Sequence, residues 1–187
     1  MEITFLRHGI AVDRMDPLCP VDFDRPLTVE GKNKVEGAVR GLRALGVKPL
    51  SILTSPFVRC VQTANLAARG LGVQKRDVVV YEHLAPGSDP AAFWHGLSEM
   101  SRERLLAVGH GDTIEPIAGL VLGFPFTDAT ESTPAESPLA LRVLHLKKAG
   151  ALQLEVPTMQ SELGTHASHA RLVWLQTARV LRQLGRG

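Results

Sequence analysis

Short runs of apolar residues alternate along the chain with stretches in which apolar residues recur every three or four positions. The first pattern is typical of buried strands, and the second is typical of helices that bury one face. Four runs predict strands, at residues 3–6, 51–54, 77–81 and 105–108. An amphipathic stretch follows each of them, so the pattern predicts strands and helices in regular alternation.

Capping residues mark where the predicted helices begin. Thr28 can cap the first helix through its hydroxyl. Ser55 supplies an N-cap and Pro56 a first-turn proline for the second helix, and Asp89 opens the third. Apolar spacing alone predicts the fourth helix, at about residues 114–122.

The C-terminal part of the chain is predicted from weaker patterns. Residues 139–146 and 151–156 are expected to form a pair of strands joined by a hairpin turn at 147–150. The stretch 123–138 is rich in Pro, Thr, Ser and Glu, shows no period, and is expected to be a mobile loop. A closing helix is expected from apolar residues at helical spacing, namely Ala167, Ala170, Trp174, Ala178 and Leu181.

Alternating strands and helices predict an α/β fold, a three-layer sandwich in which a central, mainly parallel sheet is flanked by helices on both faces. The chain has 187 residues, of which 44% are apolar and 21% charged. One hydrophobic core can organise a chain of this size and composition. We therefore expect a single domain over residues 1–187.

Charge, cysteine content and hydropathy argue against several kinds of binding site and location. The 21 basic and 19 acidic residues are spread along the chain, which leaves no polybasic arm for nucleic acid. Cys19 and Cys60 have no close cysteine partner, so neither a disulfide framework nor a Cys-rich zinc site is expected. No segment has the pattern of a signal peptide or a membrane span, so we expect a cytoplasmic protein. The patterns do not indicate an oligomeric state.

Two histidines stand where predicted strands end. His8 precedes Gly9, and His110 lies between Gly109 and Gly111. In an open α/β sheet the ligand crevice lies beyond the carboxyl ends of the strands, so both histidines are expected there. The glycines let the chain turn tightly and let a ligand approach the backbone.

Two arginines are expected beside these histidines. Arg7 precedes His8, and Arg59 falls in the first turn of the second predicted helix, where free N–H groups already favour an anion. Two guanidinium groups suit the oxygens of a phosphoryl group. A neutral imidazole is a competent nucleophile toward phosphorus, so we expect His8 to accept the phosphoryl group and His110 to donate a hydrogen bond to the developing charge.

Several short motifs carry a family resemblance. They are Leu6-Arg7-His8-Gly9, then Arg25-Pro26-Leu27-Thr28 with Gly31, then Thr54-Ser55-Pro56 with Arg59, Gln62 and Thr63, and finally Val108-Gly109-His110. In this order they resemble the histidine phosphatase superfamily, whose fold is phosphoglycerate mutase-like, over roughly residues 3–122. The short length, the early Arg-Pro-Leu-Thr element and the segment 82–87 followed by a helix most resemble its phosphohistidine phosphatase branch, the SixA-like proteins.

The resemblance implies roles for particular residues. His8 would be the phosphorylated nucleophile, with Arg7, Arg59 and His110 holding the phosphoryl oxygens. Gly9 and Ser55 complete the expected substrate-binding set, Arg25 and Thr28 match structural positions, and Glu82 falls near the position of the proton donor in related mutases. Phosphohistidine in a protein is the expected substrate, with no cofactor and no metal. A small phosphomonoester is the alternative substrate.

Other classes of protein explain these residues less well. Cys19 and Arg25 have the Cys-x5-Arg spacing of cysteine-dependent phosphatases, but Pro20 lacks an N–H donor, and Asp22 and Asp24 would repel a dianion. A module that binds a phosphorylated ligand without turnover would need the same arginines but not His8. A metal-dependent phosphoesterase would need clustered ligands, which the remaining histidines do not supply, namely His83, His95, His145, His166 and His169.

Overall fold

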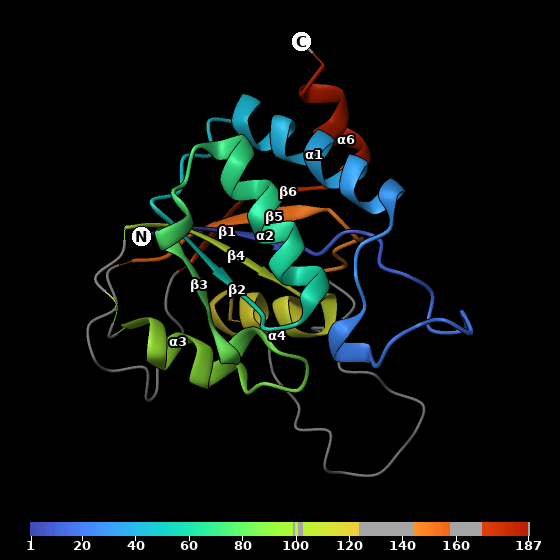
Figure 1. Ribbon diagram of the computed structural model, residues 1–187. Coiled ribbons are helices and arrows are strands. Elements are labelled where there is room, and N and C mark those ends of the chain that lie inside the picture. Colours follow the sequence, from blue (N-terminus) through green and yellow to red (C-terminus); the bar gives the residue numbers. More distant parts are fainter. Residues whose placement is uncertain (99, 101–102, 124–143, 158–169, 187) are drawn as a thin grey trace.

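The computed structural model describes residues 1–98, 100, 103–123, 144–157 and 170–186, and its centre is a six-stranded sheet (Figure 1). The order across the sheet is β3-β2-β4-β1-β5-β6. Neighbours pair in parallel from β3 to β1, whereas β5 runs antiparallel to both β1 and β6. The predicted, mainly parallel sheet is therefore confirmed. The strands are β1 (Glu2–Arg7), β2 (Ser51–Thr54), β3 (Val78–Val80), β4 (Arg104–Gly109), β5 (Ala151–Glu155) and β6 (Arg171–Gln176).

Helices cover both faces of the sheet, as the three-layer prediction requires (Figure 1). One face carries α1 (Val29–Ala44), α2 (Val58–Leu71) and α6 (Ala178–Leu184). The other face carries α3 (Pro90–Ser98) and α4 (Gly111–Val121). Short 3-10 turns, namely η1 (Asp22–Asp24), η2 (Lys75–Asp77) and η3 (Glu82–Leu84), lie in the connections. No helix among the described residues is long and apolar enough to cross a membrane.

Helix α1 begins where its sequence predicts. The Thr28 hydroxyl accepts a hydrogen bond from the Gly31 backbone N–H at 2.9 Å and so satisfies one of the free donors of the first turn. A Cβ atom on Gly31 would lie 2.0 Å from the carbonyl oxygen of Ile10. Only glycine therefore lets α1 start directly against the segment that leaves β1.

Helix α2 begins later than predicted. Its N-cap is Phe57, which makes no side-chain capping bond, and not Ser55. The Ser55 hydroxyl is instead buried at the end of β2, where it contacts His110. Ser-Pro sequences are typical of helix starts, but here the serine is used for a tertiary contact.

The C-terminal predictions are partly wrong. Trp174, expected in a helix, lies in β6. The closing helix is limited to α6 and is shorter than predicted. The turn near residues 147–150 is present, with the Gly150 N–H bonded to the Lys147 carbonyl at 2.8 Å, but residues 144–147 are not a strand. Strand β5 pairs with β1 and β6 instead. The predictions for residues 124–143 and for Ala167 lie outside the described residues.

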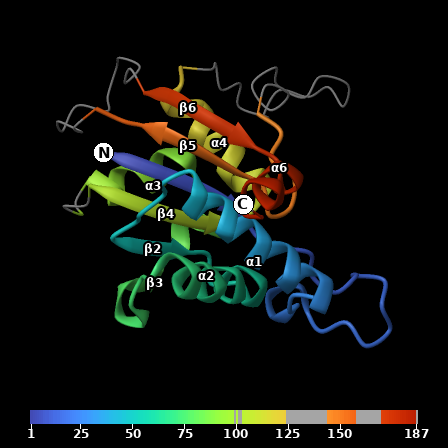
Figure 2. The same ribbon diagram turned by 90° about the horizontal axis from the view of Figure 1, so that it is seen from above.

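The topology places two strand ends side by side. Strands β1 and β4 are neighbours, with Arg7 opposite Gly109, and the His8 N–H donates to the Gly109 carbonyl at 3.0 Å. The chain leaves β1 toward α1 on one face and leaves β4 toward α4 on the other, which opens a crevice between the two connections. In Figure 2 the arrowheads of β2 and β4 point toward the end of the molecule where the segment between β1 and α1 lies.

Candidate active site

A pocket of about 580 Å³ lies at this carboxyl edge of the sheet. It brings together the four residues that the sequence predicts around a phosphoryl group, namely Arg7, His8, Arg59 and His110. Two of them follow β1 and β4, one ends β1, and one lies in the first turn of α2. Their catalytic roles stay predictions, but their shared position follows from strand pairing.

His8 is held as a neutral imidazole. The residue is 5% exposed, and Nδ1 lies 2.7 Å from the carbonyl oxygen of Gly9. A carbonyl only accepts, so Nδ1 carries the proton and Nε2 keeps its lone pair. Burial above all, together with the charges of Arg59 and Arg7, lowers the pKa of His8 from 6.5 to about 3, against the opposing effect of the Gly9 carbonyl.

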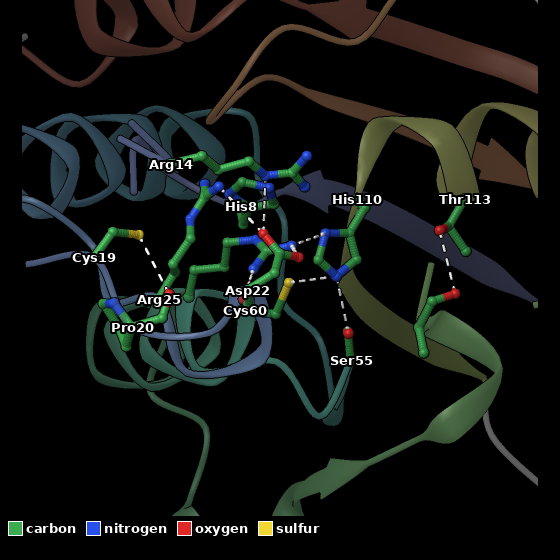
Figure 3. A network of polar contacts seen from close by, with 12 residues as sticks. His8, Arg14, Cys19, Pro20, Asp22, Arg25, Ser55, Cys60, His110 and Thr113 are labelled. Carbon is green, nitrogen blue, oxygen red and sulfur yellow. Dashed lines mark hydrogen bonds and ion pairs between the residues drawn. The ribbon is translucent and has the colours of Figure 1, made fainter. Parts of the chain in front are cut away.

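His110 lies next to His8, with the two ring centroids 5.1 Å apart. Arg59 Nη2 lies 3.3 Å from His110 Nδ1, and a guanidinium only donates, so Nδ1 accepts and Nε2 carries the proton. Nε2 lies 3.0 Å from the Ser55 hydroxyl and 3.4 Å from the Cys60 sulfur (Figure 3). Burial, the neighbouring His8 and Arg59 together lower the pKa of His110 to about 3.

Arg7 is oriented by the segment that precedes β5. Its Nη1 donates to the Leu146 carbonyl at 2.6 Å, and the Leu146 N–H donates in turn to the buried carboxyl of Glu115 at 2.8 Å. Burial raises the pKa of Glu115 above its ordinary value. A Cβ atom on Gly111 would lie 2.9 Å from the Arg7 guanidinium carbon, so this glycine of α4 makes room for the arginine.

Arg59 is almost fully buried at the start of α2. Its Nη1 donates to the Asp22 backbone carbonyl at 2.6 Å and its Nη2 to the Asp22 carboxylate at 3.1 Å. The guanidinium also lies 4.8 Å above the centre of the Phe57 ring. These contacts fix one end of the arginine beside His110 at the pocket.

Other predicted site residues lie elsewhere. Glu82 is exposed in η3 and does not line the pocket, although Pro86 of the same connection does. Gly9 packs against α1, where a Cβ atom would lie 2.6 Å from Val35, and its N–H donates to Thr63 Oγ1 at 3.2 Å. The Ser55 hydroxyl contacts Nε2 of His110, and Ser55 does not line the pocket either.

The structure also bears on the competing interpretations. Cys19 does not line the pocket, and its thiol donates to the carbonyl of Pro20 (Figure 3). Burial raises the pKa of Cys60, the other cysteine, to about 12, which keeps it a thiol. In the part of the chain that the structure describes, no group of three or more His, Cys, Asp or Glu side chains is arranged to hold a metal ion.

The pocket is also lined by charged residues that the sequence analysis did not place there. They are Arg14, Asp22, Asp112 and Lys148, together with Arg25, which was expected to be structural. Asp112 could have been found from its position two residues after His110. Arg14 stands in an irregular segment with no motif around it, so only the path of the chain brings it to the pocket. Figure 3 shows Arg14 and Asp22 on the same side of the site as His8.

Known proteins resemble this chain in sequence and in fold. Residues 3–85 match the model of the histidine phosphatase superfamily, branch 1. An uncharacterized protein of Picosynechococcus sp. is 40% identical over 126 residues, which cover 63% of this chain and 73% of that protein.

Three solved structures share the fold. The protein histidine phosphatase SixA in complex with tungstate superposes with a TM-score of 0.72 at 19% identity, over 97% of this chain and 99% of that one. A mycobacterial glucosyl-3-phosphoglycerate phosphatase has a TM-score of 0.64 at 15% identity, over 94% and 99%. A phosphoserine phosphatase from Entamoeba histolytica has a TM-score of 0.62 at 13% identity, over 96% and 98%.

A phosphoglycerate mutase-like sheet with two histidines and two arginines at its carboxyl edge defines a class of phosphoryl-transfer proteins. The chain belongs to the histidine phosphatase superfamily, and within it the chain is a hydrolase of the phosphatase type. The relatives act on different phosphorylated compounds, so their shared fold does not select a substrate.

The two buried imidazoles should make stability depend on pH. In the folded protein both have a pKa of about 3, whereas in the unfolded chain a histidine takes up a proton below about 6.5. Lowering the pH from 7 toward 4 therefore favours the unfolded state, by up to about 1.4 kcal/mol per pH unit for each imidazole. Denaturant unfolding at pH 7, 6 and 5 should show a shallower loss in His110→Gln than in the unmodified protein. Equal slopes would mean that His110 is not held neutral.

Proposed function

We propose that this chain is a phosphatase that hydrolyses phosphohistidine in a protein through a phosphohistidine of its own at His8. The observation that carries the choice of substrate is the position of Glu82, whose exposed carboxyl lies outside the pocket. The proposal requires no metal and no cofactor, because the charges that it uses belong to the chain.

The reaction consists of two displacements at phosphorus. In the first, the Nε2 lone pair of His8 attacks the phosphorus atom, the bond to the leaving group breaks, and the leaving group keeps the electron pair and takes up a proton from the solvent. In the second, water attacks the same phosphorus atom, the bond to Nε2 breaks, and inorganic phosphate leaves with His8 neutral again. The hydrogen bond from Nδ1 to the Gly9 carbonyl keeps Nε2 as the attacking atom throughout.

Charge on the phosphoryl oxygens is stabilised by Arg7, Arg59 and His110 in this proposal. Both arginines have a buried Nε atom for which the described residues supply no hydrogen-bond partner. His110 can donate from Nδ1 to an oxygen if Ser55 then donates to Nε2, because a hydroxyl can act either way. Such donors are typically worth about 10²–10³ each in rate.

The leaving group separates the two candidate substrates. An alkoxide that leaves a phosphomonoester is strongly basic, and a positioned acid typically contributes about 10²–10⁴ in rate. The imidazole that leaves phosphohistidine is much less basic and needs less help. With Glu82 outside the pocket, a phosphohistidine substrate fits the site better. The similarity in fold to a protein histidine phosphatase supports this choice.

Asp112 favours a second candidate, a phosphatase for small phosphomonoesters. Its exposed carboxyl lies in the first turn of α4 and lines the pocket, next to the glycine that makes room for Arg7. A protonated carboxyl there could supply the proton that an alkoxide needs. The glucosyl-3-phosphoglycerate and phosphoserine phosphatases with this fold act on phosphomonoesters.

A comparison of substrates distinguishes the two candidates. At matched concentrations, a phosphohistidine-bearing protein should be hydrolysed faster than an alkyl phosphate, and phenyl phosphates with acidic phenols faster than those with basic ones. Glu82→Gln should leave phosphohistidine hydrolysis within about threefold, since its carboxyl is not needed there. Asp89→Asn serves as the control, because Asp89 is an exposed carboxylate outside the pocket lining.

The opposite order would contradict the proposal. If alkyl phosphates were hydrolysed faster, and if Asp112→Asn slowed them about a hundredfold while sparing phosphohistidine, the phosphomonoester function would replace it. The assignment of His8 as the nucleophile would be unaffected by that result.

A further inference from the structure

The mouth of the pocket holds more positive charge than one phosphoryl group uses. Besides Arg7 and Arg59, the lining includes Arg14, Arg25 and Lys148. Two acidic residues of the lining other than Asp22 reduce this charge, namely Asp13 and Asp112. The Asp13 carboxylate is engaged in its own turn, where it accepts from the Met15 backbone N–H at 2.9 Å.

A single carboxylate joins three of the arginines. Asp22 Oδ1 lies 3.0 Å from Arg14 Nε and 3.2 Å from Arg25 Nη1, and Oδ2 lies 3.1 Å from Arg59 Nη2. Burial opposes ionisation of Asp22, but the Arg59 and Arg14 guanidinium groups outweigh it and hold the pKa below its ordinary value. One carboxylate thus pairs with three guanidinium groups, so the cluster keeps a net positive charge.

The position of Arg14 suits contact with a ligand. Its side chain is 69% exposed. The hydrogen bond from Nε to Asp22 fixes the guanidinium at the pocket and uses one of its five N–H donors. Arg25 contacts the same carboxylate and is only 8% exposed, and its buried Nε has no hydrogen-bond partner among the residues that the structure describes. A buried guanidinium without full pairing is costly, so an anion at this position would be favoured.

We propose that Arg14 and Arg25 form a second anion-binding subsite at the mouth of the pocket, which takes a carboxylate of the substrate beside the phosphoryl group. The proposal rests on the phosphatase function proposed above and makes Arg14 a residue that determines specificity. The carboxylate of Asp22 already contacts both guanidinium groups, which shows that this chemical group fits them. In a protein substrate the carboxylate would be an acidic side chain near the phosphorylated residue.

The test uses pairs of small ligands that differ in one charge. Phenylphosphonates and phenyl phosphates carrying a carboxylate at ring position 3 or 4 are compared with the corresponding carboxamides. Calorimetry gives the affinity of the phosphonates, and kcat/KM is measured for the phosphates. The carboxylates should be preferred by about five- to tenfold, as expected for a charge-assisted pair at a partly exposed site. Arg14→Ala should remove most of this preference and leave binding of the carboxamides nearly unchanged.

Arg171→Ala is the matched control. Arg171 is likewise exposed, and its Nε likewise donates to a carboxylate, that of Glu155 at 3.2 Å, but it lies in β6 away from the pocket. This variant should keep the preference for carboxylates. Raising the salt concentration should weaken the preference in the unmodified protein but not in Arg14→Ala.

Two results would overturn the inference. One is equal affinity for carboxylates and carboxamides at both ring positions, and the other is a preference that survives in Arg14→Ala. Turnover of a phosphohistidine-bearing protein by the unmodified protein reports the phosphatase function separately. If that protein were not hydrolysed, the proposed function would fail while the phosphonate affinities still tested the subsite.

Discussion

Replacing His8 with alanine is expected to reduce kcat by a factor of about 10³ or more, because the variant has no atom that can accept the phosphoryl group. The reason is geometric: Nε2 is the only ring nitrogen of His8 left unprotonated, since Nδ1 is bonded to the Gly9 carbonyl. Initial rates on a phosphohistidine protein and on an activated aryl phosphate measure the loss. His95→Ala is the control, since His95 is an exposed histidine of α3 outside the pocket.

A covalent intermediate gives an independent check of the same assignment. Rapid quenching with labelled substrate should trap one phosphoryl group per chain, in an adduct that is stable to base and labile to acid. The adduct should be missing in His8→Ala and present in His95→Ala. Should His8→Ala retain more than about a tenth of the activity, or should the adduct form elsewhere in the chain, His8 would not be the nucleophile.

Replacing Arg59 with alanine is expected to lower kcat/KM by about 10²–10³. The guanidinium contacts both Asp22 and His110. Its loss therefore removes positive charge from the phosphoryl site and also the hydrogen bond that Arg59 Nη2 donates to His110 Nδ1. Inhibition by vanadate, an oxyanion that resembles the displacement at phosphorus, should weaken in parallel. Arg59→Lys should recover only part of the activity, because an ammonium cannot form the same pair of contacts.

Arg69→Ala provides the comparison for Arg59. Arg69 belongs to the same helix, but its side chain is 74% exposed, and it faces Glu36 of α1 at 3.8 Å. The variant should keep its activity and its sensitivity to vanadate. Thermal unfolding of Arg59→Ala is needed beside the kinetics, since Asp22 then loses one of its partners. A folded Arg59→Ala with unchanged vanadate inhibition would exclude Arg59 from the phosphoryl site.

The sequence by itself determined the elements that deliver the chemistry. An apolar run that ends in Arg7 and His8, and another that ends before His110, are local patterns, because a short apolar run predicts a strand from the strand's own residues. The Thr28 cap is equally local, since its hydroxyl bonds to an N–H three residues away. These patterns were sufficient to predict the mainly parallel sheet and to place the two histidines at strand ends.

Only the tertiary structure decided which residues meet. Strand pairing between Arg7 and Gly109 brings His8 to His110, and the path of the chain after β1 carries Arg14 and Asp22 back over the pocket while Glu82 stays outside. Trp174 shows the same dependence, because its stretch forms β6 along the edge of β5 in place of the helix that its spacing predicted. Contacts between distant segments depend on the packing of the whole sheet and its helices, which no local pattern of apolar and polar residues specifies.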